Sequence, residues 1–229
     1  MNKLKPILIT VALLAAVAAR GQAGFTNTVN ATVPDANPTG ITSSGNLSGV
    51  SGTISSVTVS LDITGGFNGD LYAYLVDPNG DLAVLLNRVG VTAVGGNNYF
   101  GYGDTGFNVT LSSSSGNNIH NYQSGGVGTY TLNGGGQLTG TWAPDGRNIL
   151  PNSTPSAFDL AAPTADLSAF NSTVPNGQWT LFIADLSGGG TSTLVSWGLT
   201  VVTVPEPQTW AMAVGGLGML LALRRSRSK

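Results

Sequence analysis

The sequence has no cysteine, little charge and a single histidine. Without cysteine there are no disulfides, thiol nucleophiles or cysteine-based metal sites, so burial of apolar side chains must hold the fold together. Charged residues make up only 9% of the chain, and Glu206 is its one glutamate. A glycosidase built on the preceding residues would therefore have to use two aspartates.

The few charges are unevenly distributed. Between Gly24 and Val204 only Arg88 and Arg147 oppose ten aspartates, which gives a formal charge of −8. The other basic residues lie at the two ends of the chain. A surface this acidic repels a phosphate backbone, so nucleic acid is not expected as a partner, whereas cations are attracted.

Apolar side chains recur with the period of a β-strand. Val57, Val59, Leu61 and Ile63 alternate with polar residues, which is typical of a strand with one buried and one wet face. A second apolar run, 71–76, ends in the turn sequence Asp77-Pro78-Asn79-Gly80, and 82–86 supply a return strand. This stretch predicts a sheet that other strands must join.

The remaining segments fit the same class. Prolines limit 25–51 to one or two edge strands, because proline cannot donate to a ladder. Long surface loops are expected at 88–128 and 143–168, with a short helical turn near 157–161. Further strands are expected at 107–111, 129–132, 137–142, 179–183 and 197–201, the last two forming a pair. The sequence therefore predicts an all-β fold, a single antiparallel β-sandwich of jelly-roll type over residues 24–203.

The N-terminus is typical of a secretory signal peptide. A basic start at Lys3 and Lys5 is followed by an apolar run from Ile7 to Ala19 and by small residues. The run is too short to favour a permanent membrane span. We expect a signal peptide over 1–23, with cleavage after Ala19 as an alternative.

Residues 204–229 form a third segment. Val204-Pro205-Glu206-Pro207 precedes an uncharged run from Gln208 to Leu223 and a basic end that starts with Arg224 and Arg225. A helix over the uncharged run would be about 24 Å long, slightly short of a hydrocarbon core of about 30 Å. Physically, this is a marginal hydrophobic anchor helix whose arginines stay on the cytoplasmic side.

This tail resembles the PEP-CTERM sorting signal of exported bacterial proteins. Pro205, Glu206 and Pro207, the apolar segment, and Arg224 with Arg225 occur in the order of that signal. The resemblance implies processing by an exosortase, a membrane transpeptidase-like enzyme, and a link with extracellular polysaccharide and biofilm matrix. It also implies a Gram-negative envelope, where the chain is transiently anchored in the inner membrane. A plain C-terminal membrane anchor is the alternative.

Several stretches of the body together match the pattern of one known domain family. They are 33–35 with Pro38, Gly40 and Ile41, then 57–63, 69–71, 77–80, 140–144, 167–170, 176–181, Asp185 and 194–199. Through them the body resembles a P domain, the P/Homo B domain that follows the catalytic domain of subtilisin-like proprotein convertases. The resemblance covers about residues 29–202 and implies a jelly-roll β-sandwich. Its departures are Gly65-Gly66, where many members have His-Thr, and the serine run 112–115 in place of an acidic segment.

Catalysis is not expected, although the family is associated with serine-type endopeptidases. A convertase brings together an Asp, a His and a Ser. The single histidine, His120, lies in an asparagine-rich stretch with no adjacent nucleophile motif, and is expected to be a solvated loop residue.

Four aspartates near predicted strand ends are candidate calcium ligands, because Ca²⁺ binds carboxylate and carbonyl oxygens on turns. They are Asp35, Asp62, Asp70 and Asp185. Asp185 shares the parity of Trp179, Leu181 and Ile183, so it is expected on the inner face, where an unpaired carboxylate is costly. The alternative is that these aspartates bind turn amides.

Three functions remain open. The first is an exported, non-catalytic protein of the cell surface or extracellular matrix, stabilised by calcium. The second is a polysaccharide-binding module that uses the long loops and an aromatic platform. The platform would be drawn from Tyr72, Tyr74, Tyr99, Tyr102, Tyr122 and Tyr130. The third is an accessory role beside a separate subtilisin-like serine endopeptidase, which rests on analogy of fold.

Overall fold

The computed structural model describes residues 21–124, 129–204, 215–218, 224 and 226. The described residues between 21 and 204 form one compact unit. In the described part, no helix is long and apolar enough to cross a membrane. Most of the predicted signal peptide and of the predicted anchor helix lies outside the described residues, as do Pro205, Glu206, Pro207 and Arg225.

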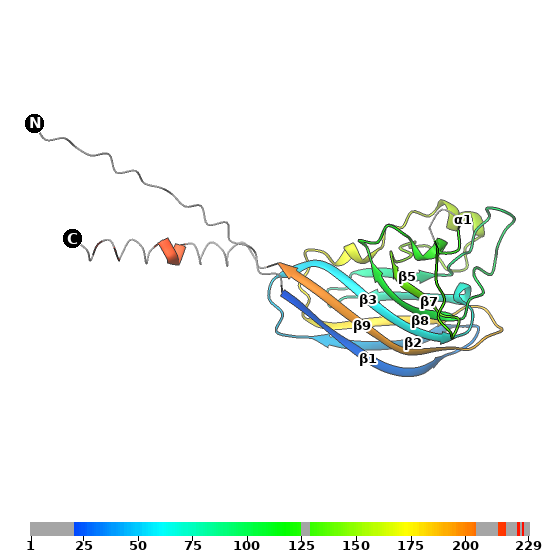
Figure 1. Cartoon of the computed structure of the whole chain (residues 1–229), viewed down its shortest axis with the longest axis horizontal. Coiled ribbons are helices and arrows are strands. Elements are labelled where there is room, and N and C mark those ends of the chain that lie inside the picture. The colour runs from blue at the N-terminus through cyan, green and yellow to red at the C-terminus, as the bar shows by residue number, and fades with distance from the viewer. Residues whose placement is uncertain (1–20, 125–128, 205–214, 219–223, 225, 227–229) are drawn as a thin grey trace, which may run out of the picture. The chain divides into compact units, whose positions relative to one another are not determined.

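Nine strands of the compact unit form two sheets (Figure 1), which confirms the all-β class. The first sheet has the order β1 (Gly21–Val33), β9 (Ser192–Val204), β3 (Thr53–Gly65), β6 (Gly106–Ser112) and β7 (Leu138–Trp142). The second has the order β2 (Asn37–Leu47), β8 (Gly177–Asp185), β4 (Leu71–Val76) and β5 (Leu82–Asn87). A short helix, α1 (Pro155–Leu160), lies in the loop before β8, close to the predicted helical turn.

All strand pairs are antiparallel except β6 and β7, which run parallel with Phe107 opposite Leu138. The prediction of a purely antiparallel sandwich is therefore wrong at this edge. A parallel pair requires a long connection, and residues 113–137 provide it. The strand expected at 129–132 is reduced to a single bridge between Leu132 and Leu138. The jelly-roll connectivity stays a prediction.

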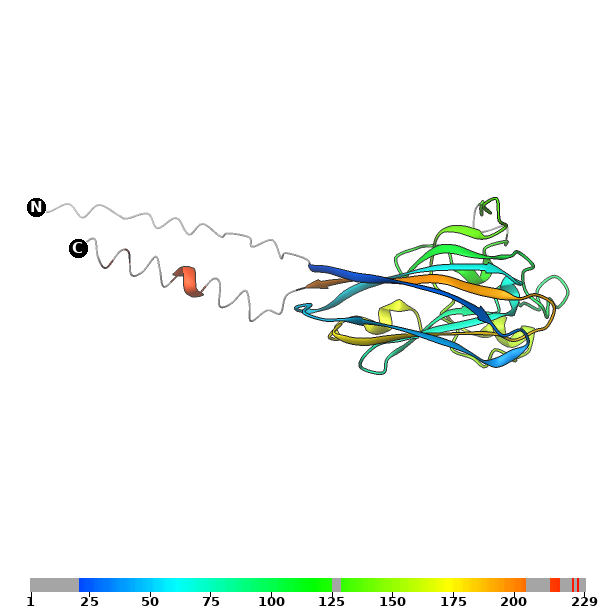
Figure 2. The same cartoon turned by 90° about the horizontal axis from the view of Figure 1, so that it is seen from below.

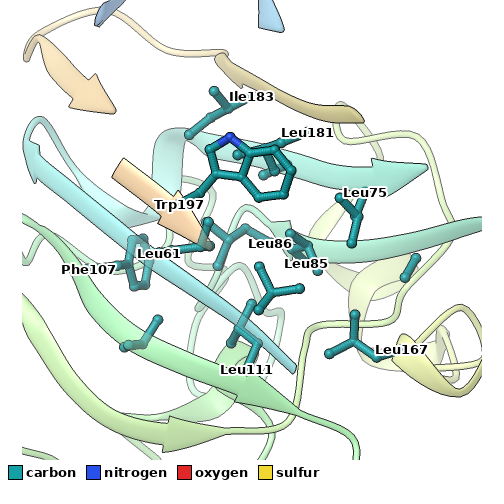
Figure 3. Packing of buried hydrophobic residues seen from close by; sticks show 14 of the residues in the cluster. Leu61, Leu75, Leu85, Leu86, Phe107, Leu111, Leu167, Leu181, Ile183 and Trp197 are labelled. Carbon is teal, nitrogen blue, oxygen red and sulfur yellow. The ribbon is translucent and has the colours of Figure 1, made fainter. Parts of the chain in front are cut away.

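Apolar side chains from both sheets fill the space between them. The predicted buried face of β3 is confirmed, because Val57, Val59, Leu61 and Ile63 are all buried. Figure 3 shows Trp197 of β9 among Leu61, Leu181 and Ile183, which come from both sheets. The Trp197 indole Nε1 donates to Ser43 Oγ of β2 at 2.8 Å. This side chain therefore ties the two sheets together by packing and by a hydrogen bond.

The last two strands do not pair with each other, although the sequence pattern predicted a pair. Both predicted apolar faces are buried, but β8 belongs to the second sheet and β9 to the first. The connections β1–β2 and β3–β4 also cross from one sheet to the other. The β4–β5 hairpin stays within one sheet, as predicted, and Asp77 Oδ1 accepts from the Asn79 and Asp81 amides in its turn.

The first strand begins inside the predicted signal peptide. Gly21, Gln22 and Ala23 pair with Thr203, Val202 and Val201 in the β1–β9 ladder. Cleavage after Ala23 would remove these three residues from the strand, whereas cleavage after Ala19 would leave the strand whole.

Candidate functional site at one end of the sandwich

Three connections between the sheets meet at one end of the sandwich. In the ladders, Val33 of β1 and Gly65 of β3 both lie opposite Ser192 of β9. The links 34–36, 66–70 and 186–191 therefore leave the strands at the same end. Figure 2 shows the two sheets as layers joined by such connections. Polar and strained residues gather here because the chain must change layers over a few residues.

Three of the four predicted calcium ligands lie at this end. Asp35 follows β1, Asp70 precedes β4, and Asp185 ends β8. Burial raises the pKa of Asp70 and of Asp185, and repulsion by Asp35 adds to both rises. Asp62 is separate, because it lies within β3 and accepts a hydrogen bond from Gln137 Nε2 at 2.8 Å. The structure thus brings together three members of the predicted set.

Asp185 is fully buried, as its parity with Trp179 predicted. Its Oδ1 accepts from the Ser187 amide at 3.2 Å, whereas Oδ2 has no hydrogen-bond partner among the described residues. Burial raises the pKa of Asp185 to about 6; repulsion by Asp70 and Asp35 adds to the rise, and the backbone amides of Ser187 and Ala36 oppose it. A buried oxygen without a partner is costly, so the Asp185 carboxyl group lowers the stability of this end.

Arg88 supplies the positive charge of this end and joins its segments. Its Nε donates to Gly69 O at 3.2 Å, and Nη2 donates to Tyr99 O at 2.9 Å and to Ser187 Oγ at 3.3 Å. The Arg88 backbone has a φ of 47°, which costs energy in a residue other than glycine. Burial lowers the pKa of Arg88, and Asp70 and Asp185 oppose that shift. The guanidinium therefore partly neutralises the buried carboxyl groups.

Calcium fits this end only in part. No group of three or more histidine, aspartate or glutamate side chains is placed to hold a metal ion in the part of the chain that the structure describes. Arg88 already offers a positive charge to Asp70 and Asp185. The free Oδ2 of Asp185 is the feature that a cation would satisfy, with backbone carbonyls as further ligands. The calcium site stays a prediction.

A pocket of about 270 Å³ opens beside these carboxyl groups. Phe67, Phe100 and Tyr102 contribute its aromatic walls, and Asp70 and Ser187 its polar ones. Phe67, Tyr99 and Phe100 have exposed fractions of 40%, 56% and 73%, and they are the exposed aromatic side chains of the described residues. Since exposed apolar groups that gather in one place often mark an interaction site, this pocket is the candidate binding site. We call it the end pocket.

The predicted platform of six tyrosines does not form. Tyr74 stacks on Phe182 of the neighbouring strand with ring centres 4.8 Å apart, and Tyr72 packs beside them. Phe182 therefore covers one face of the Tyr74 ring. Tyr102 and Tyr130 pack edge-on against the buried Tyr122. Only Tyr99 remains exposed, next to Phe100.

The expectation of a solvated His120 is wrong. Its side chain is buried, with Nδ1 2.7 Å from Asp145 Oδ2 and Nε2 3.0 Å from Val91 O. The ring also stacks on Phe158. Sequence reasoning missed this partnership, because Asp145 and Val91 are both more than 20 residues away along the chain and only the fold brings them together.

The histidine network joins separate loops. Each ring nitrogen of His120 faces an oxygen atom, one from the Asp145 carboxyl group and one from the Val91 carbonyl. Arg147 Nη1 also contacts Asp145, at 3.3 Å, and Arg147 Nε donates to Phe158 O. Within the described residues, no hydroxyl group is bonded to His120. The contacts hold together the segments near residues 91, 120 and 145–147.

Together, these features define an all-β sandwich with an acidic, aromatic-rimmed pocket at one end and a buried ionic network nearby. No family model and no curated protein matches the chain. It resembles, at 14% identity and a TM-score of 0.43, a chain of the crystal structure of the Aeromonas sobria serine protease with its chaperone ORF2. The serine protease of Aeromonas sobria alone gives 13% identity and a TM-score of 0.42. Each likeness covers 82% of this chain and 28% of the other, so this chain spans less than a third of their length.

Replacing Asp185 by Asn should change how stability depends on pH. The folded pKa of about 6 lies above the ordinary value of 3.8. The ionised group therefore destabilises the fold fully above pH 6, and this cost is relieved as the pH falls towards about 4. Without added calcium, Asp185→Asn should be more stable than wild type at pH 7.5, by on the order of 2 kcal/mol, and should lose most of this pH dependence. Urea unfolding at several pH values measures both effects.

Asp81→Asn, at an exposed turn position, is the control and should leave the pH dependence unchanged. If Asp185 binds calcium, millimolar Ca²⁺ should raise the melting temperature of wild type and not of Asp185→Asn. An Asp185→Asn variant that keeps the wild-type pH dependence would contradict the assignment of this cost to Asp185.

Removal of either partner of the His120–Asp145 pair should destabilise the fold strongly. His120→Ala removes the shortest contact of the buried Asp145 carboxyl group and the ring contact of Val91 O, and Asp145→Asn removes the charge that Arg147 also contacts. Each should cost about 3 kcal/mol. The double variant should cost clearly less than the sum, because the two residues act through one contact. Chemical unfolding of wild type, the two single variants and the double variant gives the coupling energy. Strictly additive losses of stability would refute the coupling.

Proposed function

We propose that this protein is an exported, non-catalytic β-sandwich of the bacterial cell surface or extracellular matrix. It is directed there by its N-terminal segment, and an exosortase-type enzyme acts on residues 204–229. The order Pro205-Glu206-Pro207, apolar run and arginine cluster carries this proposal. The proposal includes that the body is a P-domain-like sandwich.

The points at which the chain enters and leaves the sandwich support the proposed display on a surface. Gly21 at the start of β1 lies opposite Thr203 near the end of β9. The chain thus enters and leaves the sandwich at one end, and the end pocket lies at the other. A protein tethered through either terminal segment would therefore present the end pocket away from its point of attachment.

Sorting should depend on the short motif after β9. In a Gram-negative host that carries an exosortase, the wild-type chain should lose its tail and reach the outer surface or the medium. A variant with Pro205, Glu206 and Pro207 replaced by Ala should keep its tail and stay in the inner membrane. Cell fractionation and the mass of the C-terminal peptide measure the difference.

A variant changed only in the end pocket, Phe100→Ala, is the matched control and should be sorted like wild type. Recovery of the intact wild-type chain from the cytosol would refute export. Loss of the tail from the motif variant at the wild-type rate would refute recognition of the motif.

A second candidate function is binding of extracellular polysaccharide in the end pocket. Exposed aromatic rings offer apolar faces to sugar rings, and carboxyl and hydroxyl groups bind sugar hydroxyls. Phe67, Phe100, Asp70 and Ser187 provide both kinds of group around one cavity. This arrangement favours the loop 88–105 over the predicted loop 143–168 as the binding element.

Polysaccharide binding should require the exposed aromatic rim. Phe100→Ala and Phe67→Ala should each lower the affinity of the full-length protein for a retained polysaccharide about tenfold or more, since stacking of one ring contributes about 1–3 kcal/mol by analogy with base stacking. Affinity electrophoresis against a panel of bacterial polysaccharides measures it. Phe182→Leu removes an aromatic ring outside the pocket and should bind normally. The absence of retention on every polysaccharide would exclude this function.

The third candidate is an accessory role beside a separate subtilisin-like serine endopeptidase. It rests on the P-domain resemblance, and the low TM-scores of the solved structures add no argument to it.

A further inference from the structure

A two-sheet fold has four edge strands, and an edge strand exposes backbone groups that can pair with another strand. Three of the four edges are protected by the chain itself. At β5, the amides of Asp145 and Gly146 donate to Leu85 O and Val84 O, and the Val84 amide donates to Ala165 O. At β7, the Thr139 amide donates to Thr131 O at 2.9 Å. Loops therefore cover both of these edges.

The edge at β2 is protected in another way. Pro38 lies in this strand, and its ladder is irregular between Asn37 and Ile41. Asn27 Nδ2 of β1 donates to Ser44 O of β2 at 2.9 Å. Proline, irregular register and capped carbonyls are features by which natural edge strands avoid pairing.

β1 contains no proline, and no loop is bonded to its backbone along its first eight residues. Within residues 21–124 and 129–204, its backbone hydrogen bonds go to β9 only, and it contacts β2 through side chains such as Asn27. The ladder shifts register only between Thr28 and Ala31, where Asn30 has a φ of 49°. Gly21–Thr28 is thus a regular, proline-free strand segment with an open edge. Figure 1 shows β1 at the margin of its sheet.

The three strands around this edge carry no charge. The strands β1, β9 and β2 contain no Asp, Glu, Lys or Arg, although the chain from Gly24 to Val204 has a formal charge of −8. The aspartates of the unit therefore lie elsewhere, which leaves one neutral flank. Two copies can approach each other along this flank without placing like charges face to face, whereas a basic partner would find no carboxylate to bind there.

We infer that the β1 edge is an interface between two copies of this chain. Two Gly21–Thr28 segments pair antiparallel about a twofold axis, which joins the two five-stranded sheets into one continuous sheet. Antiparallel pairing of identical strands is self-complementary and closes as a dimer. It also places polar side chains of the same kind, such as the two Thr26 hydroxyls, near one another. This inference rests on the fold and is independent of the proposed function.

A charge at the edge should prevent the pairing, and the same charge further inside the sheet should not. Thr26 lies opposite Gly198 of β9, and Gly198 lies opposite Ser60 of β3, so the three residues form one row across the sheet. Thr26 and Ser60 are both exposed. Thr26→Lys places like charges near the twofold axis, whereas Ser60→Lys adds the same charge two strands away.

Sedimentation velocity of the full-length chain in mild detergent, over about 1–500 μM, measures the monomer–dimer equilibrium. We expect wild type and Ser60→Lys to dimerise with similar dissociation constants, and Thr26→Lys to raise the constant at least tenfold. A monomeric wild type over this range would overturn the inference, including the case in which a different strand adds to β1. If Thr26→Lys dimerises as strongly as wild type, the contact lies on another surface, and the inference is overturned as well.

The absence of cysteine provides a second readout. A single cysteine introduced at Gln22, Thr26 or Thr28 is the only thiol of its variant. Under mild oxidation, the position nearest the twofold axis should give a covalent dimer. Ser60→Cys should remain monomeric under the same conditions. A failure of all three edge positions to cross-link would refute pairing through β1, even if the wild type dimerises.

Discussion

The contact between the two sheets is the constraint on which the rest of the structure depends. With no cysteine, burial of alternating apolar side chains from both layers must offset the conformational entropy of a glycine-rich chain. Trp197 shows how the layers are joined, because its ring fills the space between them and its indole N–H binds Ser43 of the opposite sheet. The strands of each layer are held in register by this shared interior, since a shift of one residue would turn the apolar faces outward.

The same constraint produces the polar end. Because consecutive strands often lie in opposite sheets, the chain must cross between layers within short links, and three of these links meet beside Asp185 and Arg88. Burial of a carboxyl group with one unpaired oxygen costs stability that the apolar interior must offset. Costly groups of this kind often occur at functional sites. The end pocket with its two exposed aromatic rings, Phe67 and Phe100, lies at this position, so the energetic cost and the candidate site coincide.

The sequence pattern was informative where a residue's environment depends on its immediate neighbours. The alternation in β3, the turn at Asp77 and the inward parity of Asp185 follow from local periodicity, and each is confirmed. The sequence pattern failed to predict contacts between residues that are distant along the chain. His120 finds Asp145 only after two loops are folded, β7 joins β6 in parallel only after a long connection, and β8 and β9 part into different sheets. Such contacts leave no periodic signal, so hydrophobic pattern alone could not predict them.

Charge is distributed unevenly over the surface of the sandwich. The carboxyl groups beside the end pocket lie where three connections cross between the two sheets. The flank made by β1, β9 and β2, in contrast, carries no charged residue. A monomer would gain solubility from a charged edge strand, and natural edges are usually charged or covered. An open, neutral and regular edge in an otherwise acidic unit is therefore better explained by a partner strand than by solvent. Because this edge runs along the side of the sandwich, pairing there leaves the end pocket free, so assembly and ligand binding use separate surfaces.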